Sequence, residues 1–307
     1  MTTLILILLA VVAVAPFAIE ARRRPMDDRT RAAAPGQFLP LDNGLTHVRL
    51  SGPKSGPLVV CIHGLTTPSF VWDAMAEGLT QAGYRVLRYD LFGRGFSDRP
   101  DGEQDRAFFL TQLTGVLDGM GVKGRFTLIG YSMGGTIATA YAAANPERVR
   151  HLVLLAPGGL ALSNPPIWRA MRSLPILGEW LALGVMPWLF RRELRRDADT
   201  PSAVPNIAHR IIAETEIRGY APAVQASLKG ILSETQFADH QELELEEVPA
   251  LGIWGEEDDV IPLRAMGLLT QANRAAEQVM IKHAGHGLPY THPREVLEAT
   301  LSFLTRH

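Results

Sequence analysis

The stretch Thr127-Leu128-Ile129-Gly130-Tyr131-Ser132-Met133-Gly134-Gly135 decides how this chain is interpreted. An apolar, strand-like run (126–129) leads into the pattern Gly-x-Ser-x-Gly, and an Ala-rich, helix-like run (136–144) follows it. A strand, a sharp turn and a helix form the context in which this pattern predicts an exposed, nucleophilic serine. The turn strains the serine backbone, and the flanking glycines let neighbouring backbone approach closely. Ser132 is therefore the candidate nucleophile; the alternative is a glycine-rich turn in which Ser132 only caps a helix.

A serine hydroxyl needs a general base within hydrogen-bond reach, and a histidine oriented by a carboxylate can serve as that base. Two later loops supply these groups. Asp258 follows a short apolar strand (250–254), and His286 follows the last predicted strand (278–281). The order Ser132, Asp258, His286 is the one expected for a nucleophile presented by a strand–turn–helix unit. Rivals remain in the same loops, which also hold Glu256, Glu257, Asp259 and His283.

Composition narrows the class of protein. The chain has 307 residues, of which 47% are hydrophobic and 20% charged, so it can bury a large core in one α/β domain with an insertion. Its net charge of −2 gives no reason to expect a nucleic-acid partner. The single cysteine, Cys61, excludes an intrachain disulfide and a cysteine-rich metal site. Because Cys61 lies in an apolar, strand-like run, we expect a buried and inert thiol.

The N-terminal residues 1–20 form a hydrophobic anchor or signal segment. Residues 4–19 are almost wholly apolar, and Arg22-Arg23-Arg24 follows them. As a helix these sixteen residues span about 24 Å, slightly less than a hydrocarbon core of about 30 Å. A secretory signal would place positive charge before the apolar run, so we expect membrane association through residues 4–19, with a cleaved signal or a packed helix as alternatives. The arginines would keep the following domain cytoplasmic; after signal cleavage it would be secreted or periplasmic. Residues 21–37 are interpreted as a solvated linker.

Strand-like and helix-like runs alternate along most of the remaining chain. Residues 38–50 contain a hairpin signal at Asp42-Asn43-Gly44. The alternation predicts an α/β fold, namely a mostly parallel central sheet with helices on both faces, built from residues 38–158 and 248–307. The predicted strands are 58–62, 84–89, 126–129, 151–155, 250–254 and 278–281, and the predicted helices include 68–83, 105–121, one opened by Pro262, and 293–305.

Between residues 159 and 247 the strand-like runs disappear, and we expect a helical cap inserted into the α/β fold. Its Trp, Leu and Met residues form either the core of a small subdomain or the apolar underside of a lid over a substrate pocket; both can hold. A basic cluster beside them (Arg191, Arg192, Arg195, Arg196) is interpreted as a solvated helix face, with contact to an anionic membrane as the alternative.

Five segments in order resemble the α/β-hydrolase superfamily, in the capped esterase and monoacylglycerol-lipase-like group. The segments are Val60-Cys61-Ile62-His63-Gly64, Asp90-Leu91-Phe92-Gly93-Arg94-Gly95-Phe96-Ser97, Gly130-Tyr131-Ser132-Met133-Gly134-Gly135, Trp254-Gly255-Glu256-Glu257-Asp258-Asp259-Val260-Ile261-Pro262 and Ala284-Gly285-His286. The resemblance covers the chain from about residue 38 to the C-terminus, but most of the cap and the N-terminal apolar segment lie outside it. It implies Asp258 as the acid and the backbone N–H groups of Leu65 and Met133 as the oxyanion hole.

The sequence thus predicts a serine hydrolase that cleaves carboxylic esters through a Ser132–His286–Asp258 triad, with an apolar or lipid-like acyl group favoured by the cap. No metal and no organic cofactor is implied, and no oligomeric state is indicated. Amide, peptide or C–C bond hydrolysis, a cofactor-free haloperoxidase and a non-catalytic ligand-binding protein remain alternatives. We expect His63 to bond loop backbone, Asp90 to fix its loop, and Asp98 to cap a loop or pair with Arg94 or Arg99.

Overall fold

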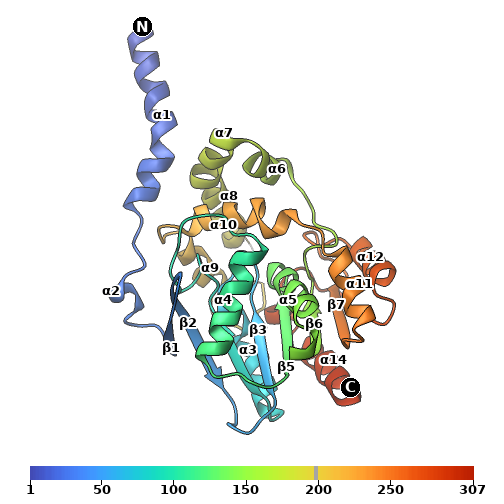
Figure 1. The fold of residues 1–307 in the computed structure, drawn as a ribbon. Coiled ribbons are helices and arrows are strands. Elements are labelled where there is room, and N and C mark those ends of the chain that lie inside the picture. Colours follow the sequence, from blue (N-terminus) through green and yellow to red (C-terminus); the bar gives the residue numbers. More distant parts are fainter. Residues whose placement is uncertain (197–199) are drawn as a thin grey trace.

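The computed structural model describes residues 1–196 and 200–307, and these residues form one eight-stranded sheet in the order β1-β2-β4-β3-β5-β6-β7-β8 (Figure 1). The hairpin strands β1 and β2 are antiparallel, as are β2 and β4, and all other neighbours are parallel. This confirms the predicted α/β fold. The strands are β1 (Gln37–Leu41), β2 (Gly44–Ser51), β3 (Leu58–Ile62), β4 (Arg85–Tyr89), β5 (Phe126–Tyr131), β6 (Val149–Leu155), β7 (Ala250–Gly255) and β8 (Glu277–Ile281).

Both faces of the sheet are buried under helices. Alternate residues of β3 enter different cores: Val59 and Cys61 pack on one side with α3 and α14, and Val60 and Ile62 on the other with α4 and α5. A strand covered on both faces needs no polar alternation, which explains the continuous apolar runs. Burial raises the pKa of the Cys61 thiol to about 12, as expected for an inert cysteine. The covering helices are α3 (Asp73–Gln81), α4 (Arg106–Gly119), α5 (Met133–Ala144), α11 (Phe237–Leu245), α12 (Arg264–Ala272), α13 (Leu288–Thr291) and α14 (Pro293–Arg306).

Some helix boundaries differ from the predicted ones. The segment predicted as a helix over 68–83 starts as a 3-10 turn, η1 (Ser69–Trp72), before α3 begins. Helix α5 begins at Met133, three residues earlier than predicted, because it follows the turn at Ser132 without a break. Helix α12 begins at Arg264 and not at Pro262.

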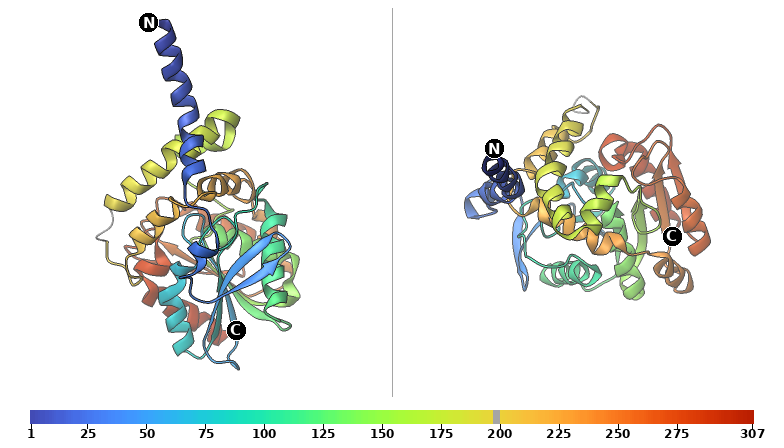
Figure 2. Two further views of the ribbon diagram at one scale, coloured as in Figure 1. Left: turned by 90° about the vertical axis from the view of Figure 1, so that its left-hand side faces the viewer. Right: turned by 90° about the horizontal axis from the view of Figure 1, so that it is seen from above.

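A helical insertion lies at one end of the sheet (Figures 1 and 2), and we call its helices α6–α10 the cap. Met171, Leu183, Met186, Tyr220 and Val224 form an apolar core of its own. Helix α11 follows the cap in sequence but contacts α5 and α12 beside the sheet. The cap elements are α6 (Pro166–Ser173), α7 (Pro175–Trp180), η3 (Leu181–Val185, one π-helical turn), α8 (Met186–Arg196), α9 (Ile207–Glu214) and α10 (Tyr220–Lys229).

Helix α1 (Thr2–Arg22) projects from the body at the same end as the cap (Figures 1 and 2). Among the described residues it is the one helix long and apolar enough to cross a membrane, and 6% of its apolar window is buried. The segment after α1 does not extend freely into solvent. It forms α2 (Asp28–Arg31), and Arg24 makes a parallel bridge with Ile217 of the cap.

Candidate active site

The turn at Ser132 has the backbone strain predicted for this motif. Ser132 has φ 53° and ψ −117°, outside the conformations that non-glycine residues normally adopt. Each flanking position must be glycine because a side chain there would collide with neighbouring backbone. A Cβ at Gly130 would lie 2.3 Å from the Gly134 carbonyl oxygen, and one at Gly134 would lie 2.1 Å from the Ile62 carbonyl oxygen. The turn therefore presents the Ser132 side chain at the C-terminal end of β5.

Three side chains from separate loops meet at this end of the sheet. Ser132 Oγ lies 2.9 Å from His286 Nε2, and His286 Nδ1 lies 2.8 Å from Asp258 Oδ2. The loops follow β5, β7 and β8, whose C-terminal ends all lie at this edge because the strands are parallel. The Asp258 side chain is 1% exposed and that of His286 20%, so the carboxylate is shielded while the imidazole edge remains accessible.

Backbone and aromatic contacts hold this arrangement. The second carboxylate oxygen of Asp258, Oδ1, accepts hydrogen bonds from Val260 N–H and Ile261 N–H, each at 2.8 Å. The ring of His286 packs on Tyr131, with ring centroids 5.2 Å apart. The carboxylate thus has one oxygen fixed by the loop and one left for the imidazole.

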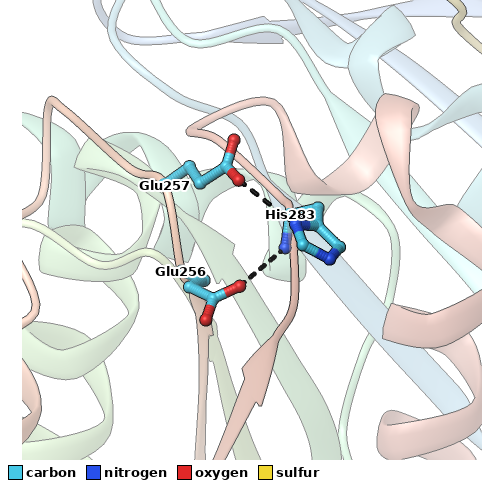
Figure 3. A group of neighbouring side chains, drawn as sticks. All are labelled: Glu256, Glu257 and His283. Carbon is cyan, nitrogen blue, oxygen red and sulfur yellow. Dashed lines mark hydrogen bonds and ion pairs between the residues drawn. The ribbon is translucent and has the colours of Figure 1, made fainter.

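Three of the rival residues in these loops, Glu256, Glu257 and His283, lie next to one another (Figure 3). His283 N–H donates to Glu256 Oε2 at 3.0 Å, and His283 Nδ1 lies 3.3 Å from Glu257 Oε1. The side chains of His283 and Glu257 are 82% and 62% exposed. Asp259 is also exposed, and its carbonyl oxygen accepts from Ser163. These groups pair with one another or face solvent, whereas His286 and Asp258 adjoin Ser132.

The loop after β3 also lies next to the serine. A Cβ at Gly64 would lie 3.3 Å from Ser132 Cβ, so the backbone leading to Leu65 passes beside the serine. Met133 is the first residue of α5, and its N–H is among those that have no acceptor within a helix. The two N–H groups that the resemblance implies as the oxyanion hole thus belong to segments adjoining Ser132.

His63 and Asp90 hold the loops behind the site, as expected. His63 Nδ1–H donates to Gly64 O at 2.8 Å, and Nε2 accepts from Leu91 N–H at 2.8 Å. Burial lowers the pKa of His63 to about 4, so the ring is neutral at pH 7. Asp90 accepts from Ser69 N–H and Phe96 N–H. Burial alone would raise the pKa of Asp90, but the adjacent His47 holds that pKa well below its usual range.

Of the two roles expected for Asp98, the structure shows the loop cap, and the ion pair of Asp98 is with Arg31 and not with Arg94 or Arg99. The Asp98 carboxylate accepts from Leu45 N–H at 2.7 Å and therefore caps the hairpin loop. Arg31 lies in the segment interpreted as a solvated linker, so no local pattern indicated this pair.

Arg94 is a buried residue whose connections the sequence did not reveal. Its guanidinium donates to the carbonyl oxygen of Leu65, to Gln104 in the core, and to Ala223 O and Ser227 Oγ of cap helix α10. Burial lowers the pKa of Arg94 to about 9, and among the described residues no carboxylate pairs with it. A charged side chain inside a glycine-rich loop was the available signal. Arg94 links the loop beside Ser132 to the cap.

A family model described as "alpha/beta hydrolase fold" matches residues 57–293. The chain belongs to this family. The matched range contains the turn at Ser132 and the loops of Leu65, Asp258 and His286, together with the whole cap.

Similar proteins include esterases. A pimeloyl-[acyl-carrier protein] methyl ester esterase of Nitrosomonas europaea is 30% identical over 78% of this chain and 92% of its own length. A bifunctional esterase/perhydrolase of Acinetobacter calcoaceticus is 25% identical over 82% of this chain and 93% of its own. Among solved structures, a membrane phospholipase A superposes with a TM-score of 0.70 at 24% identity, covering 99% of this chain and 96% of that one. The last likeness concerns the fold, and at this coverage it extends over α1.

Proposed function

We propose that this protein is a serine hydrolase that cleaves carboxylic esters through an acyl-enzyme. The observation that carries the proposal is the continuous relay from Asp258 through His286 to Ser132, with heavy-atom separations of 2.8 and 2.9 Å. This is the geometry that activates a serine hydroxyl: the carboxylate fixes the tautomer of the imidazole, and the imidazole accepts the hydroxyl proton. The esterase relatives support the reaction class.

In the first half-reaction Ser132 Oγ attacks the ester carbonyl carbon while His286 Nε2 takes the hydroxyl proton. The carbonyl oxygen becomes an oxyanion, which accepts hydrogen bonds from the N–H groups of Leu65 and Met133. Collapse of this intermediate breaks the bond to the alcohol oxygen, and His286 returns the proton to the leaving alcohol. Water then attacks the acyl-Ser132 with the same base, and release of the carboxylic acid restores Ser132. These steps require neither a metal nor an organic cofactor.

The acyl group is proposed to be apolar or lipid-like. Leu65 and Leu232 pack against the apolar core of the cap, so apolar side chains of the cap reach the loop that borders Ser132. Hydrolysis of p-nitrophenyl esters of graded chain length tests this point. We expect kcat/KM to rise from acetate to medium-chain esters, because each buried methylene contributes roughly 0.8 kcal/mol. A preference for acetate would contradict an apolar acyl site.

The chain is proposed to keep helix α1 as a membrane anchor, with the hydrolase domain cytoplasmic on the side of Arg22-Arg23-Arg24. Contacts of α1 with the cap support retention over signal cleavage: Glu20 is buried, and its Oε1 accepts from Gly219 N–H at 2.6 Å. Intact-mass measurement of protein extracted from membranes checks this. A product lacking residues 1–20 would indicate a cleaved signal.

A fluorophosphonate probe tests the enzyme class. We expect covalent labelling of the purified protein, and loss of labelling in Ser132→Ala with the fold retained by circular dichroism. His283→Ala is the matched control, because this exposed histidine lies in the same loop as His286. Folded protein that takes no label would favour a non-catalytic binding module. Labelling that persists in Ser132→Ala would refute the assignment of the nucleophile.

A further inference from the structure

The second half of helix α1 packs against the cap. Trp180 Nε1–H donates to Val12 O at 3.0 Å. A Cβ at Gly184 would lie 3.0 Å from Pro16 Cγ, so the helix and η3 are in close contact there. Nearer the body, Arg23 pairs with Glu20 at 2.5 Å and donates to Leu183 O at 3.3 Å. The cap therefore contacts α1 from Val12 to Arg23, well inside the apolar stretch.

This contact fixes how deep the cap lies if α1 crosses a bilayer. Val12 is seven residues before Ile19, so it lies about 10 Å inside the apolar stretch. Beyond the Trp180 contact only residues 2–11 remain, and as a helix they reach about 15 Å, roughly half of a hydrocarbon core of about 30 Å. Helix α1 consequently cannot span a bilayer while α7 stays in water.

The surface of the cap at this level is suited to lipid. Leu174, Ile176 and Leu177 are exposed side by side at the junction of α6 and α7, with Ile176 80% exposed. We call Leu174–Leu177 the corner. Away from α1 and the cap, the large apolar side chains that are exposed among the described residues are scattered singly, as on ordinary protein surfaces (Leu50, Leu245, Leu263 and Met280).

Aromatic and basic side chains of α8 match an anionic membrane surface. Trp188 on α8 is 58% exposed, and the Arg192 guanidinium lies 5.6 Å from its ring centroid. Tryptophan and arginine together are typical of the level at which acyl chains meet headgroups. Figures 1 and 2 show α6, α7 and α8 at the end of the molecule from which α1 projects. The basic residues on α6 and α8 are Arg169, Arg172, Arg191, Arg192, Arg195 and Arg196.

We propose that the corner inserts into the leaflet beside α1, with the arginines of α8 against anionic headgroups, so that the lipid bilayer is the partner of this surface. The proposal rests on the proposed anchor and deepens the proposed function, because a cap seated in the leaflet receives its ester from the membrane and not from water. Helix α1 sets the depth of α7, and the corner at the start of α7 is exposed and apolar.

A depth measurement tests insertion without any need for activity. The full-length chain carrying Ile176→Cys is labelled with the fluorophore NBD and reconstituted into vesicles of phosphatidylcholine and phosphatidylglycerol that contain acyl-chain spin labels. The native Cys61 is fully buried and does not compete for the label. Leu245→Cys is the matched control, since Leu245 is a leucine 77% exposed on α11. We expect a blue-shifted, strongly quenched signal at position 176 and neither effect at 245. Equal quenching at the two positions would overturn the proposal.

A second experiment reads the consequence for substrate. Ile176→Asp combined with Leu177→Asp should lower hydrolysis of a long-chain ester held in vesicles by about ten-fold or more, because two charges must enter the leaflet. Hydrolysis of a short soluble ester should not change, and Leu245→Asp should change neither. Undiminished vesicle hydrolysis would overturn the proposal, and so would an equal loss on both esters, which would assign the corner to folding. If the unsubstituted chain hydrolyses no ester, the proposed function fails, and the quenching measurement still decides insertion.

Discussion

Replacing Asp258 by Asn tests which ring nitrogen of His286 carries the hydrogen. The loop allows the side-chain amide of the new asparagine only one orientation. Val260 N–H and Ile261 N–H both donate to Oδ1 of Asp258, so an asparagine must place its carbonyl oxygen there. Its NH2 group then faces His286 Nδ1, at the position where Oδ2 lies 2.8 Å away. The imidazole must accept at Nδ1 and carry its hydrogen on Nε2.

A hydrogen on Nε2 points at Ser132 Oγ, 2.9 Å away, so the ring cannot take the hydroxyl proton. In serine hydrolases of this geometry the same tautomer change lowers kcat by about 10⁴-fold. We expect a similar loss here, equivalent to about 5 kcal/mol of transition-state stabilisation. KM should change little, because Asp258 lies behind the imidazole and is 1% exposed.

Steady-state hydrolysis of a p-nitrophenyl ester provides the measurement, with thermal unfolding as the check that the fold is intact. Glu257→Gln is the control, since this carboxylate of the same loop is exposed and faces His283. It should leave kcat within about two-fold of the starting value, as most surface substitutions do. Near-normal kcat in Asp258→Asn, or a large loss in Glu257→Gln, would refute the assignment of the acid.

Three further predictions concern other parts of the chain. Arg94→Met should lower kcat on a soluble ester about ten-fold with a smaller change in KM, since it frees Leu65 O from its buried donor; Arg94→Lys should recover part of the loss, and kinetics of both variants check this. His240 is buried with neither ring nitrogen bonded, and burial lowers its pKa to about 4; protons therefore bind the unfolded chain first as pH falls from about 6.5 to 4, and stability is lost in that window. Denaturant unfolding at pH 7 and pH 5 should show that His240→Leu loses less stability on acidification than the unsubstituted chain does. Equal losses in the two proteins would contradict this reasoning. Replacing Arg191, Arg192, Arg195 and Arg196 by Gln should weaken the salt dependence of vesicle hydrolysis, and rates measured across ionic strengths would show it.

The elements predicted well are those with a local cause. The continuous apolar run of β3 is buried on both faces of the sheet. The glycines on either side of Ser132 are required because a Cβ added there would lie closer than 2.5 Å to a backbone oxygen. The loops of Asp258 and His286 could be placed near Ser132 because loops after parallel strands converge at one edge, and the choice of Asp258 among its acidic neighbours rested on the family resemblance. The catalytic roles of both residues stay proposals until tested.

The features that sequence reasoning missed depend on contacts between distant segments. Arg31 meets Asp98 across 67 positions, and Arg94 meets Ser227 across 133. Neither pair leaves a periodic or local signal, because each residue also fits an ordinary surface loop. The same holds for Glu20, which ends an apolar helix in the sequence but is buried against Gly219 in the structure. Such pairs are visible only once segments that are distant in the sequence have been placed next to one another.

The helices of the cap differ in how many hydrogen bonds hold them to the body of the protein, and this affects the route by which a substrate reaches Ser132. Helix α10 is fixed to the body: Arg94 donates to Ala223 O and Ser227 Oγ, and Tyr220 O–H donates to Thr66 O. Lifting α10 would leave the buried guanidinium without these acceptors, at a cost of about 1–3 kcal/mol for each bond. Helix α6 is joined to α10 by apolar packing and by the bond from Gln225 to Met171 O. We therefore expect entry from the side of α6 and α7, which is the side that faces the membrane when the corner is inserted, so that a lipid-like ester need not pass through water.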